Sequence, residues 1–185
     1  MIKLLPSKGK LLIAEPSIID DSFGRTVVLL TEHNENGSVG FILNKPLGYT
    51  INDLVPDLNC NSEVFNGGPV EQDNLYFIHQ SPEIVPNSIE ICNGIYWGGD
   101  FPELKKLIND KKIQPDSIRF FLGYSGWSSK QLITEMKEDS WVVSKEISTP
   151  KILSIKTEKM WRVQMIDLGG DYKIWANSPS DPAMN

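Results

Sequence analysis

Residues 25–44 have the sequence RTVVLLTEHNENGSVGFILN, and this stretch decides most about the fold. Two runs rich in apolar and β-branched residues, 25–33 and 38–44, flank the tetrapeptide Asn34-Glu35-Asn36-Gly37. Such runs favour strands, and an Asn-Gly pair favours the positive φ angles of a tight hairpin turn. The stretch therefore predicts an antiparallel hairpin that turns at Asn36-Gly37, so at least part of the sheet is antiparallel.

Short strands and short helices are predicted along the rest of the chain. Further strands are expected at residues 9–14, 63–66, 74–79, 89–97, 118–124 and 141–143. Helices are expected at residues 50–54, 100–109, 128–137 and 157–168, with Asp100 capping the second. Because strands outnumber helices and the helices are scattered between them, we predict a mixed α/β (α+β) fold. A single domain is expected over residues 1–185, with an irregular tail from about residue 177.

The composition is that of an acidic globular chain. It has 185 residues, with 18 Lys and Arg against 24 Asp and Glu, a net charge of −6 and a pI near 5.0. This charge disfavours direct binding to duplex DNA or to an anionic membrane, and no apolar run is long enough to span a bilayer. No secretory leader pattern occurs, so Cys60 and Cys92 are expected to be free thiols in the cytoplasm.

Two paired-glycine turns supply the candidate binding surface. Gly67-Gly68 lies in FNGGPVE (residues 65–71), and Gly98-Gly99 lies in YWGGDF (residues 96–101). Paired glycines mark a sharp bend or a close approach of the backbone. We expect the two turns to lie close together, with their acidic residues bordering one shared surface. That surface is expected to comprise Arg25, Asn44, Gly67, Gly68, Glu71, Gly98, Gly99, Asp100 and Ser125.

Ser125 is the candidate nucleophile. The segment GYSGW (residues 123–127) is similar to the Gly-x-Ser-x-Gly nucleophile elbow, but Trp127 stands where the elbow needs a small residue. The segment is therefore interpreted as a tight turn from a strand into a helix. His33 and His79 each end a predicted strand, which favours polar packing at the surface over a role as general base.

Neither a metal nor a cofactor is expected. The two histidines and two cysteines show no C-x-x-C or H-x-x-x-H spacing, so the sequence predicts no zinc site. Gly98-Gly99 does precede a predicted helix, as in phosphate-binding loops. However, Asp100 places a negative charge where the phosphate would lie, and no P-loop lysine follows.

Six motifs occur in order along nearly the whole chain. They are GKLLIA (9–14), DSFGRTVVLLTEH (21–33), GFILNKP (40–46), NGGPVE (66–71), GGDF (98–101) and RFFLGYSGW (119–127). Together these motifs resemble the AlgH/YqgE family of bacterial proteins, although members often carry a small residue where Asn66 stands. The resemblance implies a single compact domain with a bifurcated, partly barrel-like sheet surrounded by helices. It implies little about activity, because most members are uncharacterised and one carries a label as a transcriptional regulator.

Three functions remain open at this point. The first is a non-enzymatic binding or regulatory module that contacts a protein or a small molecule. The sequence leaves open the identity of that partner and the oligomeric state of this protein. The second is a hydrolase or transferase that uses Ser125 or a set of Asp and His residues. The third is direct DNA binding, which the acidic balance and the lack of a basic recognition helix disfavour.

Overall fold

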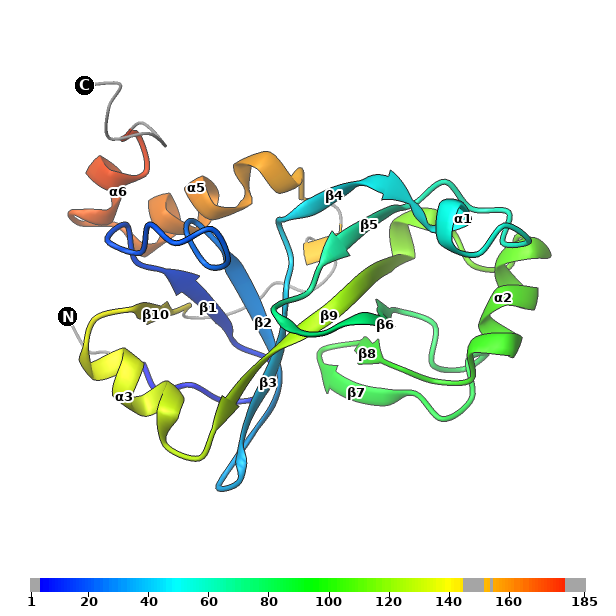
Figure 1. Ribbon diagram of the computed structural model, residues 1–185, viewed down its shortest axis with the longest axis horizontal. Coiled ribbons are helices and arrows are strands. Elements are labelled where there is room, and N and C mark those ends of the chain that lie inside the picture. The colour runs from blue at the N-terminus through cyan, green and yellow to red at the C-terminus, as the bar shows by residue number, and fades with distance from the viewer. Residues whose placement is uncertain (1–3, 145–151, 154, 179–185) are drawn as a thin grey trace.

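The computed structural model describes residues 4–144, 152–153 and 155–178 (Figure 1). Within these residues, ten strands belong to one sheet: β1 (Leu11–Ala14), β2 (Val27–Asn34), β3 (Gly37–Ile42), β4 (Pro46–Thr50), β5 (Glu63–Asn66), β6 (Val70–His79), β7 (Ile89–Cys92), β8 (Ile95–Trp97), β9 (Ile118–Ser128) and β10 (Trp141–Val143). The helices are α1 (Ile51–Leu54), α2 (Phe101–Asn109), α3 (Gln131–Lys137), α5 (Thr157–Leu168) and α6 (Tyr172–Trp175), with a 3₁₀ helix at Pro115–Ser117. The predicted mixed α/β class is confirmed.

The sheet branches at its longest strand, β9, which crosses the middle of the molecule in Figure 1. Its last residues, 125–128, pair antiparallel with β3. Residues 120–122 pair in parallel with β5, and residues 118–124 pair antiparallel with β6. The strand order is β10-β1-β2-β3-β9-β6-β8-β7. Outside this order, β5 pairs with β9 and β4 pairs with β5. The sheet is thus bifurcated, as the resemblance implied, but it does not close into a barrel.

The antiparallel hairpin predicted at residues 25–44 is confirmed. Strands β2 and β3 pair from Val28↔Ile42 to Asn34↔Gly37, with one irregularity between Leu30 and Glu32. The two-residue loop is therefore Glu35-Asn36, one residue earlier than the predicted turn at Asn36-Gly37. A Cβ atom at Gly37 would lie 2.3 Å from the carbonyl oxygen of Trp127. This glycine thus allows β9 to approach the hairpin closely.

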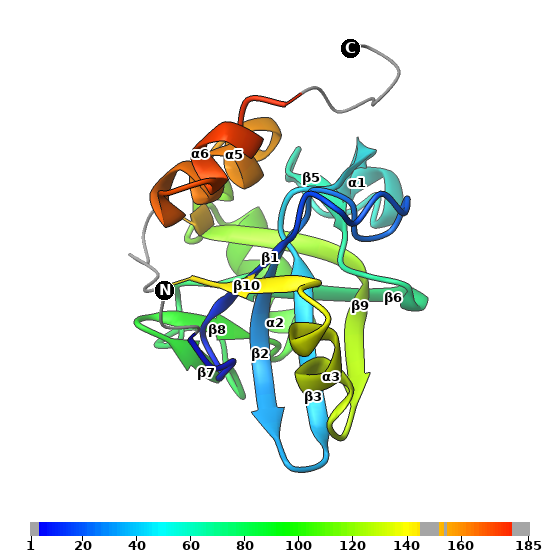
Figure 2. The same ribbon diagram turned by 90° about the vertical axis from the view of Figure 1, so that its left-hand side faces the viewer.

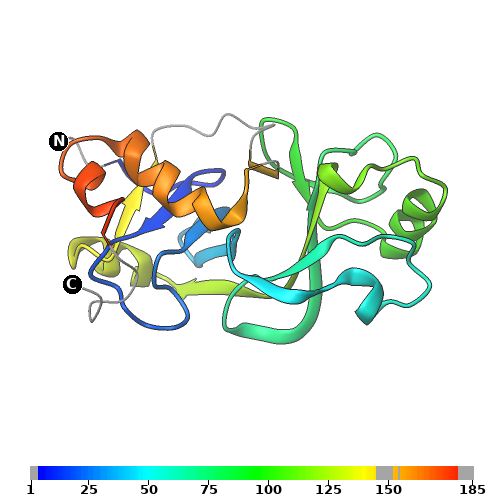
Figure 3. The same ribbon diagram turned by 90° about the horizontal axis from the view of Figure 1, so that it is seen from above.

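Helices cover the sheet in separate places, and consecutive residues of β9 serve different cores because strand side chains alternate between faces. Phe121 belongs to the core that α5 covers through Met160 and Met165, and Figure 3 shows α5 and α6 above that part of the sheet. Phe120 belongs to a second core, which α2 completes through Leu104, Leu107 and Ile108. A third core contains Leu132 of α3 and Trp127, and Figure 2 shows α3 beside β3 and β10.

Several element boundaries differ from the predictions. The strand expected at 118–124 continues to Ser128, because residues 125–128 pair with β3 instead of turning into a helix. Helix α3 begins at Gln131 after Lys130, which has a left-handed φ of 67°. Strand β4 and helix α6 were not predicted. Most of the tail expected from about residue 177 lies outside the described residues.

Candidate functional site

The glycine pair at residues 67–68 lies where the connection from β5 to β6 crosses β9. A Cβ atom at Gly67 would lie 2.2 Å from the carbonyl oxygen of Gly123, and one at Gly68 would lie 2.3 Å from that of Tyr124. The amide of Gly67 donates to the Leu122 carbonyl at 2.8 Å. We call this crossing, formed by Gly67, Gly68, Gly123 and Ser125, the strand junction. The close approach expected at these glycines is therefore an approach of the protein's own backbone.

Ser125 belongs to the strand junction and is closed to substrate. Its side chain is fully buried, and its hydroxyl donates a hydrogen bond to the carbonyl oxygen of Gly67 at 3.1 Å. The residue pairs with Gly40 within the sheet. The predicted strand-to-helix turn at this serine is therefore wrong, and the hydroxyl helps to hold two backbone segments together.

Arg25 and Asn44 do lie together, through main-chain contacts. The Asn44 side chain accepts from the amide of Val27 and donates to the carbonyl of Arg25, both at 2.9 Å. Arg25 has a left-handed φ of 54°, and its guanidinium lies 4.8 Å from the centre of the Trp161 ring. The same guanidinium donates to the Ser178 carbonyl at 2.9 Å. The side chain of Arg25 thus fastens the start of β2 to the C-terminal helices.

The second glycine pair lies near the far end of β6. The amide of Gly98 donates to the carbonyl of Phe77 at 3.1 Å, and Asp100 caps α2 by accepting from the amide of Glu103 at 2.9 Å. This capping role agrees with the prediction. His79, predicted to pack near the surface, is instead fully buried beside this turn. Burial lowers the pKa of its imidazole, whose Nδ1 accepts from the amide of Ser81 at 3.1 Å.

Glu71 lies on an exposed bulge of β6, close to the start of that strand. Its carboxylate accepts from the Tyr76 hydroxyl at 2.5 Å and from the Asn74 amide at 2.8 Å, and these bonds lower the pKa of Glu71. Gly67-Gly68 precedes the first residue of β6, whereas Gly98 contacts Phe77 near its last. The two glycine pairs thus lie near different ends of β6, and each serves a different backbone contact.

Arg119 is a buried charge that the sequence reasoning did not single out. It is 6% exposed, and its guanidinium donates to the carbonyls of Leu43 at 2.9 Å and Leu153 at 3.0 Å. The guanidinium also lies 4.8 Å from the centre of the Phe65 ring. Burial lowers the pKa of Arg119 to about 10, so the group stays charged near neutral pH. The sequence signal for this buried charge is an arginine inside the apolar run of β9.

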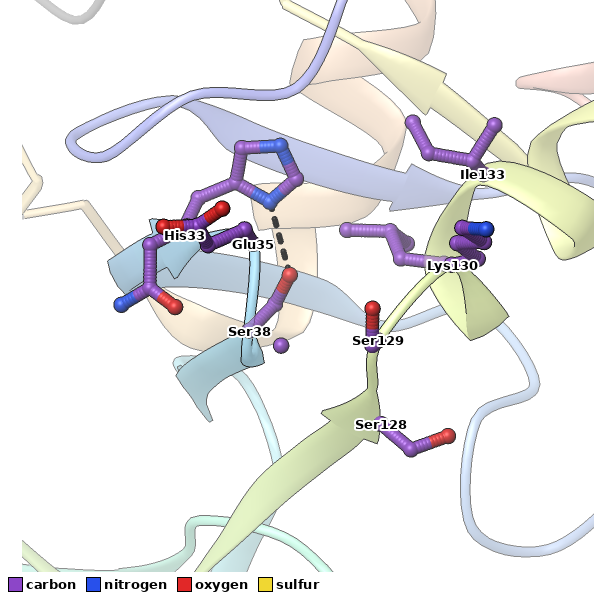
Figure 4. A pocket seen from close by; sticks show the side chains of 10 residues that line it. His33, Glu35, Ser38, Ser128, Ser129, Lys130 and Ile133 are labelled. Atoms are coloured by element: carbon purple, nitrogen blue, oxygen red, sulfur yellow. Dashed lines mark hydrogen bonds between the residues drawn. The ribbon is translucent and has the colours of Figure 1, made fainter.

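A cleft lies at the opposite end of β9, between the tip of the β2–β3 hairpin and the start of α3 (Figure 4). Its volume is about 350 Å³. We call it the hairpin cleft, and its lining comprises His33, Asn34, Glu35, Gly37, Ser38, Ser128, Ser129, Lys130, Leu132 and Ile133. The polar run at residues 128–130, which follows an apolar strand, is the sequence feature that could have indicated it.

The two walls of the hairpin cleft carry different groups. On the hairpin wall, His33 Nδ1 lies 2.7 Å from the Ser38 hydroxyl, its cross-strand partner. On the other wall, Gln131 accepts from the amide of Ser128 at 3.0 Å. The lining therefore combines hydroxyl, imidazole and charged groups with two aliphatic side chains of α3. Such a mixture suits recognition of a small polar molecule that carries an apolar part.

Helix α3, which forms that second wall, is joined to the sheet by one of its own carboxylates, that of Glu135. One carboxylate oxygen of Glu135 accepts from the indole nitrogens of both Trp127 and Trp141, each at 2.8 Å. The other accepts from Gln131 at 3.0 Å. Both tryptophans are 5% exposed, so the two indole hydrogen bonds are partly shielded from water, whereas the Gln131 bond is exposed. The position of this wall of the cleft therefore depends on Glu135.

The described residues contain neither a cluster of metal ligands nor a helix suited to cross a membrane. They hold no group of three or more His, Cys, Asp or Glu side chains placed to bind a metal ion. No helix in the same part of the chain combines the length and apolar character needed to cross a bilayer.

The branched sheet, the glycine crossing and the surrounding helices define a class of small α/β protein with known relatives. A family model described as AlgH-like matches residues 11–173. The chain therefore belongs to the AlgH-like family.

Relatives agree with this assignment, and two solved structures share the fold. A protein of Cytophaga hutchinsonii, named UPF0301 protein, is 44% identical over 97% of this chain and 99% of its own length. One from Bacteroides thetaiotaomicron with the same name is 44% identical over 98% and 93%. A crystal structure of a Corynebacterium diphtheriae protein (TM-score 0.76, 22% identity, covering 96% and 95%) has a similar fold. So does the solution structure of the AlgH protein of Pseudomonas aeruginosa (TM-score 0.72, 24% identity, 97% and 98%).

Proposed function

We propose that this protein is a non-enzymatic binding module and that the hairpin cleft is its ligand site. The observation that carries the proposal is a concave site of about 350 Å³ in which polar groups from two elements converge. Small-molecule sites usually measure about 300–1,000 Å³ and combine apolar walls with a few placed polar groups. The Ser125 hydroxyl, by contrast, already donates a hydrogen bond to the backbone carbonyl of Gly67.

In this proposal, any regulatory effect follows from ligand-dependent contacts with other proteins. Direct reading of duplex DNA is disfavoured by the net charge of −6, since phosphate contacts require basic side chains. A cytoplasmic location is part of the same proposal. Both cysteines are free, and disulfides persist mainly in oxidising compartments.

The test is recovery of a bound molecule. The protein is isolated from its own bacterium under mild salt, and co-purified small molecules are identified by mass spectrometry. Ser129→Trp fills the cleft, and Lys137→Trp places the same ring on an exposed site outside the lining. We expect one molecule to accompany the wild type and Lys137→Trp but not Ser129→Trp. Equal recovery with both variants, or recovery with none, contradicts the proposal.

A second candidate is a serine hydrolase, favoured by the 2.7 Å contact between His33 Nδ1 and Ser38, although Ser38 is only 4% exposed. A histidine within hydrogen-bond reach of a serine is the arrangement that activates a nucleophile. A fluorophosphonate probe separates the candidates, because attack by the Ser38 hydroxyl releases fluoride and leaves a phosphonyl group on the oxygen. An adduct on Ser38 that disappears in His33→Gln supports the hydrolase. An unlabelled protein supports the binding module.

A further inference from the structure

We infer that the hairpin cleft binds a zwitterion: a small molecule of amino-acid or dipeptide size with a free ammonium group, a free carboxylate and an apolar side chain. This inference rests on the proposed binding function and names the ligand class. It starts from the distribution of charge over the lining of the cleft.

The two formal charges of the lining lie on opposite walls. Glu35 is its one carboxylate and belongs to the two-residue loop of the hairpin. Lys130 is its one ammonium group and immediately precedes α3, across the cleft in Figure 4. A ligand with one charge of each sign can satisfy both walls at once, whereas a simple anion or cation meets one attractive and one repulsive group.

Hydrogen-bonding groups lie beside each charge. Ser129 is exposed next to Lys130 and can donate its hydroxyl to a carboxylate there. On the hairpin wall, the Asn34 side chain already accepts from the amide of Asn36 at 2.8 Å, which holds Glu35 in a defined loop. The acid of the cleft is therefore presented by an ordered turn, which reduces the entropy lost on binding.

The apolar part of the lining belongs to α3, on the same wall as Lys130. Leu132 is 2% exposed, and Ile133 is half-buried beside it on α3. Leu132 belongs to the third core, so an aliphatic side chain of the ligand would pack mainly on Ile133 while its charged ends reach the walls. A volume of about 350 Å³ is near the lower end of the usual range for small-molecule sites, which suits a ligand of this size.

The experiment uses the dipeptide L-alanyl-L-leucine as probe, with two blocked forms. Binding to the full chain is followed by amide chemical shifts of the cleft residues. The N-acetylated form lacks the ammonium group, and the C-amidated form lacks the carboxylate. Hydrogen bonds to charged groups contribute about 1.5–3 kcal/mol, so we expect each blocked form to bind at least about tenfold more weakly.

Variants assign each end of the ligand to a wall. Glu35→Gln is expected to weaken the free dipeptide about tenfold and to leave the affinity for the acetylated form unchanged. Lys130→Gln is expected to weaken the free dipeptide about tenfold and to leave the affinity for the amidated form unchanged. Glu138→Gln and Lys137→Gln make the same charge changes on exposed residues outside the lining and should leave all affinities unchanged.

The outcomes separate this inference from the proposed function. Equal binding of the free and blocked dipeptides, or no binding of any of them, overturns the zwitterion inference. If a molecule of another class is still excluded from Ser129→Trp in the recovery experiment, the proposed binding function stands alone. If the dipeptide test fails and Ser129→Trp also excludes no co-purified molecule, the proposed function is contradicted as well.

Discussion

Ser125 and Ser128 lie three residues apart on the same strand, yet their surroundings differ completely. Ser125 is buried at the strand junction, where a second backbone segment crosses β9. The Gly67 carbonyl of that segment accepts a hydrogen bond from the Ser125 hydroxyl. Ser128 is exposed and lines the hairpin cleft. The NGGPVE and RFFLGYSGW motifs therefore mark where backbones cross, whereas the hairpin cleft is lined mostly by polar residues outside these motifs.

The strongest test of this contrast is Gly123→Ala. A Cβ atom there would lie 2.6 Å from the Gly68 carbonyl oxygen and 2.7 Å from that of Val70, and the residue has a φ of 70°. Overpacking costs about 1–3 kcal/mol and a left-handed φ about 1–2 kcal/mol, so we expect a loss of about 3 kcal/mol or more. Urea unfolding measures the loss. Gly126→Ala is the control in the same strand, since its nearest contact is a movable tyrosine ring at 3.3 Å; equal losses contradict the crossing.

A smaller effect is expected from Glu135→Ala, because Glu135 links the α3 wall of the hairpin cleft to the tryptophans of the third core. The change leaves the indole N–H groups of Trp127 and Trp141 without their acceptor. An unsatisfied buried donor costs about 1–3 kcal/mol, so we expect a loss of about 2 kcal/mol together with weaker ligand binding in the cleft. Glu138→Ala, on the exposed end of α3, should change neither quantity. Stability retained in Glu135→Ala would show that packing alone holds this wall.

Ser125→Ala should cost about 1 kcal/mol, because one hydrogen bond is lost while the Gly67 carbonyl still accepts from Ile42. Ligand binding in the cleft should stay at the wild-type level. Thermal unfolding and the dipeptide titration measure the two quantities separately. Loss of binding without loss of stability would return Ser125 to the list of functional residues.

The smallest effect on stability is expected within the cleft. Glu35→Gln and Lys130→Gln change exposed side chains, and surface substitutions usually stay within about ±0.5 kcal/mol. Their effect should appear in ligand binding and be absent from urea unfolding without ligand. Large destabilisation by either variant would mean that the cleft walls, like the strand junction, are structural.

Much of the fold follows from local sequence patterns, whereas the arrangement of sites does not. The hairpin could be predicted because its turn and its apolar runs agree, and the Asp100 cap because one side chain decides it. Strand β4 was missed because PLGYT has no alternating pattern and pairs with β5 at just Pro46 and Thr50. The end of β9 was misplaced because GYSGW (residues 123–127) resembles a turn from a strand into a helix, although Gly123 serves a contact with residues far away in the chain.

The same non-local character limits the candidate site. Glycine motifs predicted close approach correctly, but the sequence does not say whether a ligand or another strand approaches. The hairpin cleft joins residues 33–38 to residues 128–133, and neither segment carries a distinctive motif for binding. His79 was misplaced because its burial depends on Ser81, Ser88 and Gly98 closing around it.

The position of β9 in the chain has a consequence for biosynthesis. Its three partner strands, β3, β5 and β6, all precede it, and all remain without that partner until residues 118–128 have left the ribosome. Unpaired strand edges on incomplete chains promote association with other chains, and pairings between distant segments form slowly. A nascent chain that stops before residue 118 is therefore the species of this protein most in need of a chaperone.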